Sequence, residues 1–506
     1  MGRRIIMKVL FVSPELKYNL DTPPMPLGIM AIGTCLKQIG HNVRIFNRSI
    51  HTESLTDLYK DFAPDIVGIT IISTRMVKDA IKVSKFFKSK GVPVVWGGIF
   101  PSAMPEVILK ESYVDYVSIG EGEKTWAEFL DAIENGTDLS AIKGLAFKKD
   151  DKIIINPERE FMNPQEIPEI DYSLVDINEY TNNYGEEVGT KMIWLYSAKG
   201  CPHQCSFCYN KAFNKCKYRR RPVESYMGEI KYLLENTEVN SIFFADEIWC
   251  HSKKDLRERC EQIKKYNLDF TWGCFMNIGV LDEEDYRYMY DCGCRLVYYG
   301  VESGSQEILD KMKKPIKASL AVDEIKNCSD AGILPFVSFI IGFPDETEKE
   351  LKQTADMLKQ VSYYGKLFCY FYIPYVGSEL FDSMVERKQI KSINSIKDIN
   401  LKFPFNTMVK NSKKNLSRVP TRDLNLIYSY ALLWSFYNKE ELRNCKNIIS
   451  ATYKGVFDFL GHNVNAGYKR TSFFAFLYGI AYTYASAVLR VIFLRSTAQK
   501  YGLRLR

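Results

Sequence analysis

The sequence predicts an α/β protein with two parallel-sheet domains followed by a helical C-terminal region. The chain has 506 residues, more than one ordinary hydrophobic core accommodates. Two stretches alternate continuous apolar strands with amphipathic helices, one before residue 140 and one after residue 191. Such alternation is typical of parallel sheets covered by helices on both faces. From about residue 400 the strand pattern gives way to helical spacing.

The first stretch predicts a doubly wound, Rossmann-like domain over residues 1–140. We expect strands at 8–14, 42–47, 64–72, 92–98 and 114–123, with helices at 27–40 and 77–91. Ligands bind such sheets beyond the carboxyl ends of the strands. Those ends carry small and polar residues, among them Ser13, Ser73, Thr74, Gly97, Gly98, Gly120, Glu121 and Gly122.

Residues 141–190 are polar and predict an irregular linker between domains. Residues 191–390 contain six strand-and-helix units, fewer than a closed eight-unit barrel requires. We therefore expect a partial, TIM-like (β/α)6 barrel that is open on one side, with functional residues again at the strand ends. Residues 391–506 are expected to form a helical domain.

The charge pattern argues against nucleic-acid binding. The net charge is +7, and the stretch after Asp458 has seven Lys and Arg residues without Asp or Glu. The rest of the chain is thus balanced and predicts no broad basic surface. The N-terminus shows no secretory signal, so a cytoplasmic location with reduced thiols is expected. The 13 cysteines then favour metal binding over disulfides.

An uncharged apolar segment lies at residues 472–489, flanked by basic residues. Three interpretations stay open: a core helix, a helix lying on the anionic inner face of a membrane through residues 470–506, or a membrane span. The expected substrate is a small molecule. Contact with a membrane would favour a lipid as that substrate.

The stretch "KGCPHQCSFCYN" places Cys201, Cys205 and Cys208 in one short segment. Gly200 and Pro202 argue against a regular helix, so a loop is expected. Three thiolates can hold three irons of a [4Fe–4S] cluster and leave the fourth for an external amine and carboxylate. The rival interpretation adds His203 to make a structural zinc site in a metal-stabilised binding protein.

The spacing CxxxCxxC, with the aromatic residues Phe207 and Tyr209 around its last cysteine, resembles radical S-adenosylmethionine (SAM) enzymes. The resemblance implies an oxygen-sensitive [4Fe–4S] cluster whose free iron chelates SAM. Reductive cleavage of SAM then yields a 5′-deoxyadenosyl radical. It also implies an external electron donor of the flavodoxin or ferredoxin type.

Further segments match the same family in the expected order. "FFADEIW" resembles its second-strand segment, "GVESGSQEIL" its ribose-binding segment, and "FIIGFPDETEKELKQT" its "GfPgET" strand end. By this resemblance, Glu302 binds the ribose of SAM and the backbone near Gly342 and Pro344 borders the adenosine. The remaining SAM-site residues that the resemblance implies are Tyr209, Asp246 and Glu247. The partner of the SAM carboxylate is open, with Arg219, Arg220 and Arg221 as candidates.

The N-terminal segments "PDIVGITII", "VVWGGIFPSAMPE" and "VDYVSIGEGE" resemble the cobalamin (B12)-binding domain that precedes this barrel in one large subclass. The cobalamin contacts implied are Ser73, Thr74, Gly97, Gly98, Gly120 and Glu121. The DxHxxG motif of an axial histidine is absent, since His41, His51 and His203 do not fit it. Cobalamin would then bind without a protein imidazole.

The resemblance implies a cobalamin-dependent radical SAM enzyme, a class B-like methyltransferase. Its expected reaction methylates an unactivated carbon through the 5′-deoxyadenosyl radical and methylcobalamin. A non-methylating cyclisation, oxidation or rearrangement is the alternative, and a zinc-stabilised binding protein is the second alternative. No catalytic side chain is assigned, and the substrate has no motif in the sequence.

Overall fold

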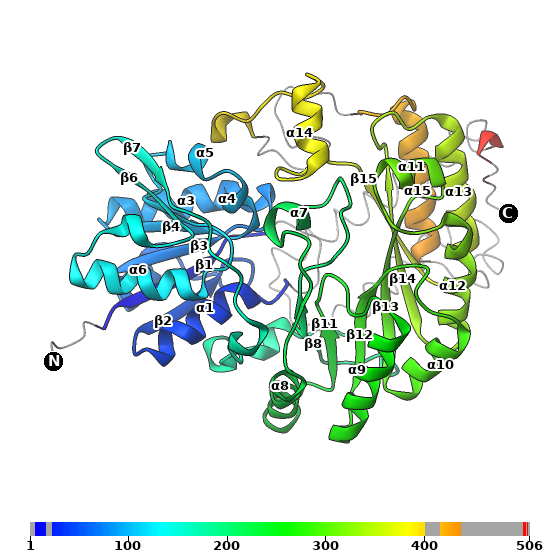
Figure 1. Ribbon diagram of the computed structural model, residues 1–506, viewed down its shortest axis with the longest axis horizontal. Coiled ribbons are helices and arrows are strands. Elements are labelled where there is room, and N and C mark those ends of the chain that lie inside the picture. The colour runs from blue at the N-terminus through cyan, green and yellow to red at the C-terminus, as the bar shows by residue number, and fades with distance from the viewer. Residues whose placement is uncertain (1–5, 17–22, 400–414, 437–498, 502, 504–506) are drawn as a thin grey trace. The chain divides into compact units, whose positions relative to one another are not determined.

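The computed structural model describes residues 6–16, 23–399, 415–436, 499–501 and 503 (Figure 1). The chain divides into two compact units. The first unit comprises residues 1–182, 193–239 and 373–413, and the second comprises 183–192, 240–372 and 414–506. The cysteine loop belongs to the first unit, whereas Asp246, Glu302 and Gly342 belong to the second.

The first unit is built on a sheet with the strand order β2-β1-β3-β4-β5-β6-β7. Its strands are β1 (Lys8–Ser13), β2 (Asn42–Asn47), β3 (Ile66–Thr70), β4 (Val94–Gly97), β5 (Tyr116–Ser118), β6 (Leu145–Lys149) and β7 (Lys152–Ile155). Strands β1 to β5 pair in parallel, and their continuous apolar residues are buried on both faces. The predicted doubly wound parallel sheet is confirmed.

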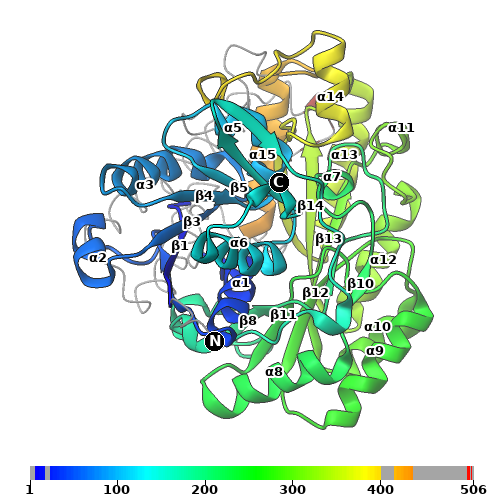
Figure 2. The ribbon, with the colours of Figure 1, turned by 60° about the vertical axis from the view of Figure 1, so that its left-hand side comes forward.

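Helices cover both faces of this sheet. They are α1 (Leu27–Gln38), α2 (Leu55–Phe62), α3 (Val77–Ser89), α4 (Ile99–Ala103), α5 (Pro105–Leu109) and α6 (Glu123–Asn135). Helices α1 and α6 pack side by side on one face, and α3 lies on the other (Figures 1 and 2). On the α6 face, Trp126 meets Phe11 edge-on at 4.8 Å between ring centroids. On the α3 face, the indole of Trp96 donates to Ser84 at 2.8 Å.

The segment expected to be an irregular linker instead adds a hairpin to the sheet. Strand β6 pairs antiparallel with both β5 and β7. Asp150 and Asp151 join β6 to β7 with φ values of 48° and 59°. A two-residue turn needs such positive φ angles to match the strand twist, and Asp tolerates them.

Between the hairpin and β8, short 3-10 turns follow one another at Pro164–Glu166, Tyr172–Leu174 and Ile177–Tyr180. The residue before each turn caps it: its side chain accepts a hydrogen bond from the backbone N–H two residues further on. The capping residues are Asn163, Asp171 and Asp176. This part of the segment is thus built from short turns.

The second sheet has the order β15-β14-β13-β12-β11-β8 within the described residues. Its strands are β8 (Met192–Leu195), β11 (Ser241–Phe244), β12 (Thr271–Met276), β13 (Cys294–Glu302), β14 (Leu334–Ile341) and β15 (Lys366–Phe371). Strands β11 to β15 pair in parallel and in chain order. Successive parallel neighbours without closure are the arrangement of a partial barrel, as predicted.

The helices of the second unit follow its strands as the alternating pattern predicts. They are α9 (Lys253–Tyr266), α10 (Glu283–Asp291), α11 (Gln306–Lys311), α12 (Ala318–Asp330), α13 (Glu348–Val361) and α15 (Thr421–Phe436). Capping boxes begin α10 at Asp282 and α13 at Thr347. Helix α15 packs against β15 and α13, where Tyr428 stacks on Phe371 at 5.3 Å.

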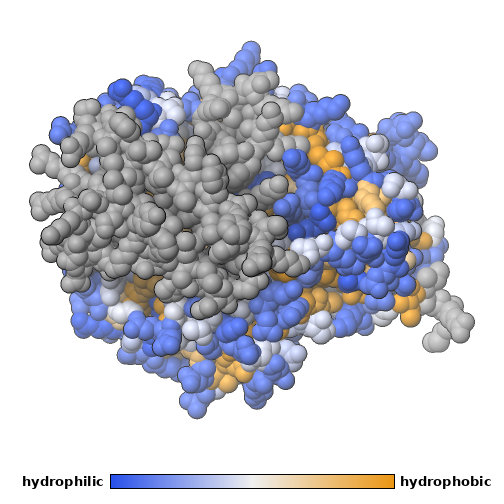
Figure 3. Space-filling view, turned by 180° about the vertical axis from the view of Figure 1, so that it is seen from behind, coloured by the Kyte–Doolittle hydropathy of each residue, from blue (hydrophilic) through white to orange (hydrophobic). Residues whose placement is uncertain are grey.

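The apolar segment 472–489 and most of the basic tail lie outside the described residues. Within those residues, no helix has both the length and the apolar character needed to cross a membrane. On the face that Figure 3 shows, hydrophobic residues form small groups among hydrophilic ones.

A buried ion pair anchors α8 (Val223–Asn236) in the first unit. Arg221 lies 2.5 Å from Glu229, and both side chains are almost fully buried. The other carboxylate oxygen of Glu229 accepts from the hydroxyl of Tyr172 at 3.1 Å. Arg221 also donates to the carbonyl of Tyr196 at 2.8 Å. Arg221, one candidate partner of the SAM carboxylate, is thus engaged in holding the fold.

We expect Glu229→Gln to lower the free energy of unfolding by about 3 kcal/mol, because the guanidinium of Arg221 then stays buried without an opposite charge. Urea denaturation followed by circular dichroism measures the change. Glu235→Gln on the same helix is the control, since its exposed side chain lies 3.8 Å from Lys231. That variant should shift stability by less than about 0.5 kcal/mol. Equal losses in both variants would contradict the role of the buried pair.

Candidate functional site

Two short strands close the base of the cysteine loop. Strands β9 (Ala198–Lys199) and β10 (Arg219–Arg220) pair antiparallel, so residues 200–218 form the loop between them. Gly200 opens the loop with φ of +82°, and a Cβ atom there would lie 2.0 Å from the carbonyl oxygen of Lys217. Only glycine fits this close approach of two backbone segments.

Asn210, the first residue of α7 (Asn210–Phe213), ties the loop together from within. Its amide nitrogen donates to the carbonyls of Cys201 at 2.7 Å and His203 at 3.2 Å. Its amide oxygen accepts from the backbone N–H of Cys201 at 3.2 Å. The side chain is buried, so these bonds form away from water. Asn210 is a positioning residue that the sequence motif did not identify, although it follows the motif directly.

The three thiols of the loop are half-buried and not in disulfides. A turn brings the N–H of Cys208 to the carbonyl of Cys205 at 3.1 Å. Within the described residues, no three His, Cys, Asp or Glu side chains are already gathered in a metal-binding group. The donor set still fits an iron–sulfur cluster, because three accessible thiols share one backbone-tied loop. Cys201, Cys205 and Cys208 therefore stay the predicted cluster ligands.

A buried ion-pair network holds the base of this loop. Lys199 lies 3.0 Å from Glu123 and 3.4 Å from Glu121, and Arg219 lies 2.9 Å from Glu121. Burial alone would raise the pKa of Glu121, but Lys199 and Arg219 outweigh it and lower that pKa. Burial would lower the pKa of Lys199, yet Glu123 and Glu121 raise it. Glu121 and Lys199 are therefore charged partners at neutral pH.

The carboxyl edge of the first sheet gathers the predicted cobalamin contacts. Gly98 has φ of +96°, and a Cβ atom there would lie 2.9 Å from the carbonyl oxygen of Ile71. Gly120 has φ of +74° and open space around it. The described residues give the buried hydroxyl of Ser73 no hydrogen-bond partner, and the neighbouring Ile72 is 52% exposed. An unsatisfied hydroxyl beside exposed apolar surface fits a large ligand carrying both amide and apolar groups.

The other predicted contacts at this edge have structural roles. Gly97 ends β4, and Thr74 begins a 3-10 turn with a buried side chain. Glu121 accepts the N–H of Met162 at 3.1 Å in addition to its cations. These contacts occupy the carboxylate of Glu121, which favours a positioning role. The site assignments stay predictions.

Neither histidine near the N-terminal sheet is available as an axial ligand. His41 is buried and accepts the N–H of Met7 at 3.3 Å, before β1 begins. His51 lies 3.0 Å from Glu179 and accepts the N–H of Asn47 at 3.2 Å. Both contacts fit structural histidines.

In the second unit, Glu302 ends β13 with φ of +68°, beyond a shift in strand register. Its side chain is almost fully buried, and Lys314 lies 3.5 Å away. Burial raises the pKa of this carboxyl, although Lys314 and Ser338 act in the opposite direction. A strained, desolvated carboxyl at a strand end is typical of a binding residue.

Asp246 and Glu247 differ in their surroundings. Asp246 is fully buried and lies 3.9 Å from the guanidinium of Arg259 on α9. Arg259 also lies 3.3 Å from Asp255, so it joins two carboxylates inside the unit. Glu247 is half-buried and is the more accessible of the predicted pair. Arg259 was not identified from the sequence, because no motif marks it.

Gly342 and Pro344 lie in the turn after β14, beside the buried Glu346. The N–H of Gly342 donates to Oε2 of Glu346 at 2.7 Å, and Oε1 is buried without a hydrogen-bond partner in the described part of the chain. Burial raises the pKa of Glu346 to about 8, although the N–H groups of Gly342 and Phe343 act in the opposite direction. Glu346 is thus a largely neutral acid that organises the predicted adenosine-binding turn.

Most of the remaining cysteines are core residues. Cys250, Cys260, Cys274, Cys292, Cys294, Cys328 and Cys369 are buried in the second unit. Burial raises the pKa of Cys274 and of Cys328, which keeps these thiols protonated. This confirms that Cys292 and Cys294 are buried small residues, as predicted.

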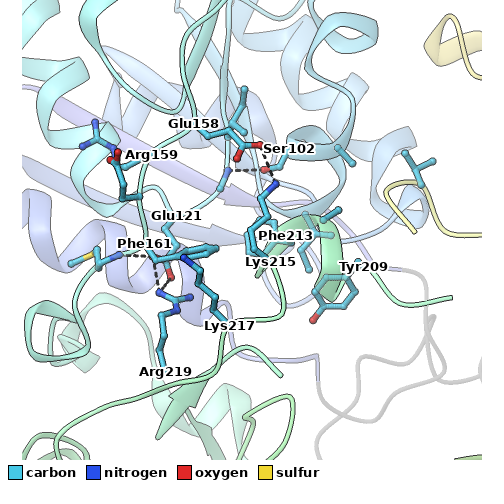
Figure 4. A pocket seen from close by; sticks show the side chains of 18 residues that line it. Ser102, Glu121, Glu158, Arg159, Phe161, Tyr209, Phe213, Lys215, Lys217 and Arg219 are labelled. Atoms are coloured by element: carbon cyan, nitrogen blue, oxygen red, sulfur yellow. Dashed lines mark hydrogen bonds and ion pairs between the residues drawn. The ribbon is translucent and has the colours of Figure 1, made fainter. Parts of the chain in front are cut away.

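A cavity of about 500 Å³ lies inside the first unit, next to the cysteine loop (Figure 4). Tyr209, which the sequence assigns to SAM binding, lines it together with Gly120 and Glu121. Residues from segments 99–103, 158–162 and 212–219, together with Ile119 and Val376, supply the other walls. The cavity therefore joins residues predicted for both cofactors.

Comparison with known proteins gives the same assignment for both halves of the chain. Residues 195–358 match the Radical SAM superfamily, and residues 18–130 match the B12 binding domain. The chain is 31% identical over 400 residues to an uncharacterized methyltransferase of Pyrococcus horikoshii, covering 77% of this chain and 85% of that protein. It is 24% identical over 377 residues to the anaerobic magnesium-protoporphyrin IX monomethyl ester cyclase of Synechocystis, covering 72% and 74%.

Among solved structures, the radical S-adenosylmethionine methyltransferase TsrM of Kitasatospora setae, with cobalamin and a [4Fe–4S] cluster bound, has the same fold. The TM-score is 0.63 at 20% identity, covering 76% of this chain and 75% of that one. The cysteine loop and the partial barrel thus define a radical SAM protein. The chain belongs to the radical SAM family in which a B12-binding domain precedes the barrel.

We expect Asn210→Asp to reduce the iron bound after anaerobic reconstitution to about half or less. A carboxylate facing the carbonyls of Cys201 and His203 replaces two attractive contacts with repulsive ones. Iron and sulfide analysis, together with the visible absorption of the cluster, measures the loss. Asn236→Asp is the control, because Asn236 is exposed at the end of α8. Full iron content in Asn210→Asp would show that the hydrogen bonds of Asn210 are not needed for cluster binding.

We expect Glu346 to make the protein less stable as the pH rises from about 4.5 to about 8. The folded state keeps its proton over this range while the unfolded state loses it, since burial raises the folded pKa from 4.5 to about 8. The slope reaches at most about 1.4 kcal/mol per pH unit. Glu346→Gln, which mimics the protonated acid, should flatten this part of the curve and stabilise the protein at pH 8. Denaturation at each pH from 5 to 8 measures the free energy of unfolding of both proteins. The same pH dependence in both would contradict the raised pKa of Glu346.

Proposed function

We propose that this enzyme methylates an unactivated carbon of a small molecule in a radical reaction that uses a [4Fe–4S] cluster, SAM and cobalamin. The observation that carries the proposal is the loop of Cys201, Cys205 and Cys208, held by Asn210 and by paired strands. Three thiols leave one iron of a cluster for SAM. The relative from Pyrococcus horikoshii is described as a methyltransferase, which supports methyl transfer.

When bound, the cluster supplies the electron that cleaves SAM, and cobalamin supplies the methyl group. The residues of the chain bind and orient these cofactors. The loop thiolates hold the cluster, and the buried carboxyl of Glu302 accepts hydrogen bonds from the ribose hydroxyls. The backbone of Gly342 and Pro344 borders the adenosine, while Glu346 keeps their turn in shape.

For cobalamin, the chain offers the carboxyl edge of its first sheet. The buried hydroxyl of Ser73 can donate to, or accept from, an amide of the corrin periphery. Gly98 and Gly120 leave the backbone open to close approach. Without an axial histidine, cobalamin would be held by its periphery.

The alternative reaction keeps the radical and omits methyl transfer, as in a cyclisation, oxidation or rearrangement. It is favoured by one observation, the likeness to the magnesium-protoporphyrin cyclase of Synechocystis. The products separate the two reactions. Methylation releases S-adenosylhomocysteine together with 5′-deoxyadenosine, whereas the alternative releases 5′-deoxyadenosine without S-adenosylhomocysteine.

Cluster reduction requires an external one-electron donor, for which we propose a flavodoxin- or ferredoxin-like protein. A peripheral membrane contact through residues 470–506 is proposed on the sequence alone, from its basic flanks and apolar segment. A lipid substrate depends on that contact.

We expect Cys205→Ala to abolish both the brown cluster absorption and the cleavage of SAM, because two thiolates cannot hold three irons. Cys216→Ala is the matched control, since Cys216 lies in the same loop but outside the motif. Chromatography of 5′-deoxyadenosine after reduction with dithionite measures cleavage. Normal 5′-deoxyadenosine formation by Cys205→Ala would overturn the proposed function.

A further inference from the structure

The cavity of the first unit brings three cations to one wall, from Lys215, Lys217 and Arg219 (Figure 4). Lys215 is neutralised, because its ammonium group lies 3.1 Å from Glu158. Lys217 has no carboxylate partner among the described residues, and Arg219 is only partly engaged. This wall therefore has more positive groups than carboxylates to pair with them.

Arg219 uses only one of its three nitrogens. Nη1 donates to Glu121 at 2.9 and 3.1 Å, while Nε and Nη2 are buried without a hydrogen-bond partner among the described residues. Nε and Nη2 form the side edge of the guanidinium, whose two parallel N–H bonds match a carboxylate or phosphate in a bidentate contact. The side chain is 9% exposed, so bulk solvent reaches it little. A buried pair of unsatisfied donors costs free energy unless a ligand accepts them.

Both Arg219 and Lys217 lie near the ring of Phe161 in this wall (Figure 4). The guanidinium carbon of Arg219 lies 4.1 Å from the ring centroid, and Nζ of Lys217 lies 5.8 Å from it. A contact with the ring face stabilises the cations but accepts no N–H bond lying in the guanidinium plane. The N–H of Met162 binds Glu121, so one carboxylate places both Phe161 and Arg219.

The acidic residues of the cavity are already paired. Glu121 binds Lys199 and Arg219, Glu158 binds Lys215, and Glu160 binds Lys143 at 2.7 Å. Arg159, the remaining cation of the lining, pairs with Glu128. Among the described residues, Lys217 is the cation of the lining without a carboxylate partner, and the free edge of Arg219 adds two unsatisfied N–H donors. A positive charge beside unsatisfied donors favours an anion.

We propose that Arg219 and Lys217 bind an oxyanion group, a carboxylate or a phosphate, carried by the substrate. This inference rests on the proposed function, because it takes the cavity beside the cysteine loop as the place where the substrate is anchored. The side edge of Arg219 binds two oxygens of the group, and Lys217 adds charge from the exposed rim. Phe161 flanks the anchor and offers an apolar surface to the part of the substrate next to the anion.

The test measures binding of inorganic pyrophosphate to the full-length, cluster-loaded protein by anaerobic calorimetry at constant ionic strength. We expect saturable binding that weakens about tenfold or more in Arg219→Lys, which keeps the charge but loses the bidentate edge. Lys217→Met should weaken binding a few-fold, as expected for a partly exposed charge. Lys349→Met is the control, because Lys349 is exposed on α13 in the other unit and should leave binding unchanged.

Circular dichroism checks that Arg219→Lys is folded. If that variant does not fold, the weaker binding expected for Lys217→Met still tests the proposal. Absence of saturable binding, or equal weakening by Lys349→Met, would overturn the proposal. Repeating the titration with saturating hydroxocobalamin and SAM distinguishes the sources of the anion. Unchanged binding supports a substrate group, whereas competition would assign the site to the phosphodiester of cobalamin or the carboxylate of SAM and overturn the substrate assignment. None of these results depends on methyl transfer, so they stay separate from a failure of the proposed function.

Discussion

The site of the first unit depends on one interaction, the pairing of the carboxylate of Glu121 with Lys199 and Arg219. Lys199 and Arg219 stand directly opposite each other on β9 and β10, at the two ends of the cysteine loop. Two like charges in that position repel each other unless an anion lies between them. Glu121 provides that anion, and its side chain is only 7% exposed, so the attraction is weakly screened. The base of the cysteine loop, the predicted cluster site, is thus held by a residue that follows the last parallel strand of the N-terminal sheet.

The two units stabilise their buried carboxyls in opposite ways. Lys199 and Arg219 lower the pKa of Glu121, which is charged and acts as a rigid anchor. Burial raises the pKa of Glu302 and of Glu346, whose surroundings supply too little positive charge to offset it. The anchor therefore works at any physiological pH, whereas the acids of the second unit respond to the hydroxyl and N–H donors around them. A bound ribose would add such donors to Glu302 and favour its charged form.

Much of the fold could be predicted because its signals are local. The apolar runs that became β1, β3 and β14 are buried strands whatever lies around them, and the spacing of the cysteines defines their loop. The pairing of Asp246 with Arg259 could not be predicted, because it arises only when α9 folds back onto the end of β11. The network around Glu121 likewise joins residues about 80 to 100 positions apart. The β6–β7 hairpin was missed although its two adjacent Asp residues were a usable turn signal.

The buried cysteines have a consequence for how the protein acquires iron. Cys274 and Cys328 are buried in the second unit, and burial raises the pKa of both, so these thiols stay protonated and offer no thiolate to a metal ion. The loop thiols are half-buried, as is Cys35 among the other described cysteines. In the folded chain, iron can therefore reach the half-buried loop thiols more readily than the buried thiols of the second unit. Iron that meets the chain while it is still unfolded finds no such selection, so the order of folding and metal delivery decides whether the metal ends in the right place.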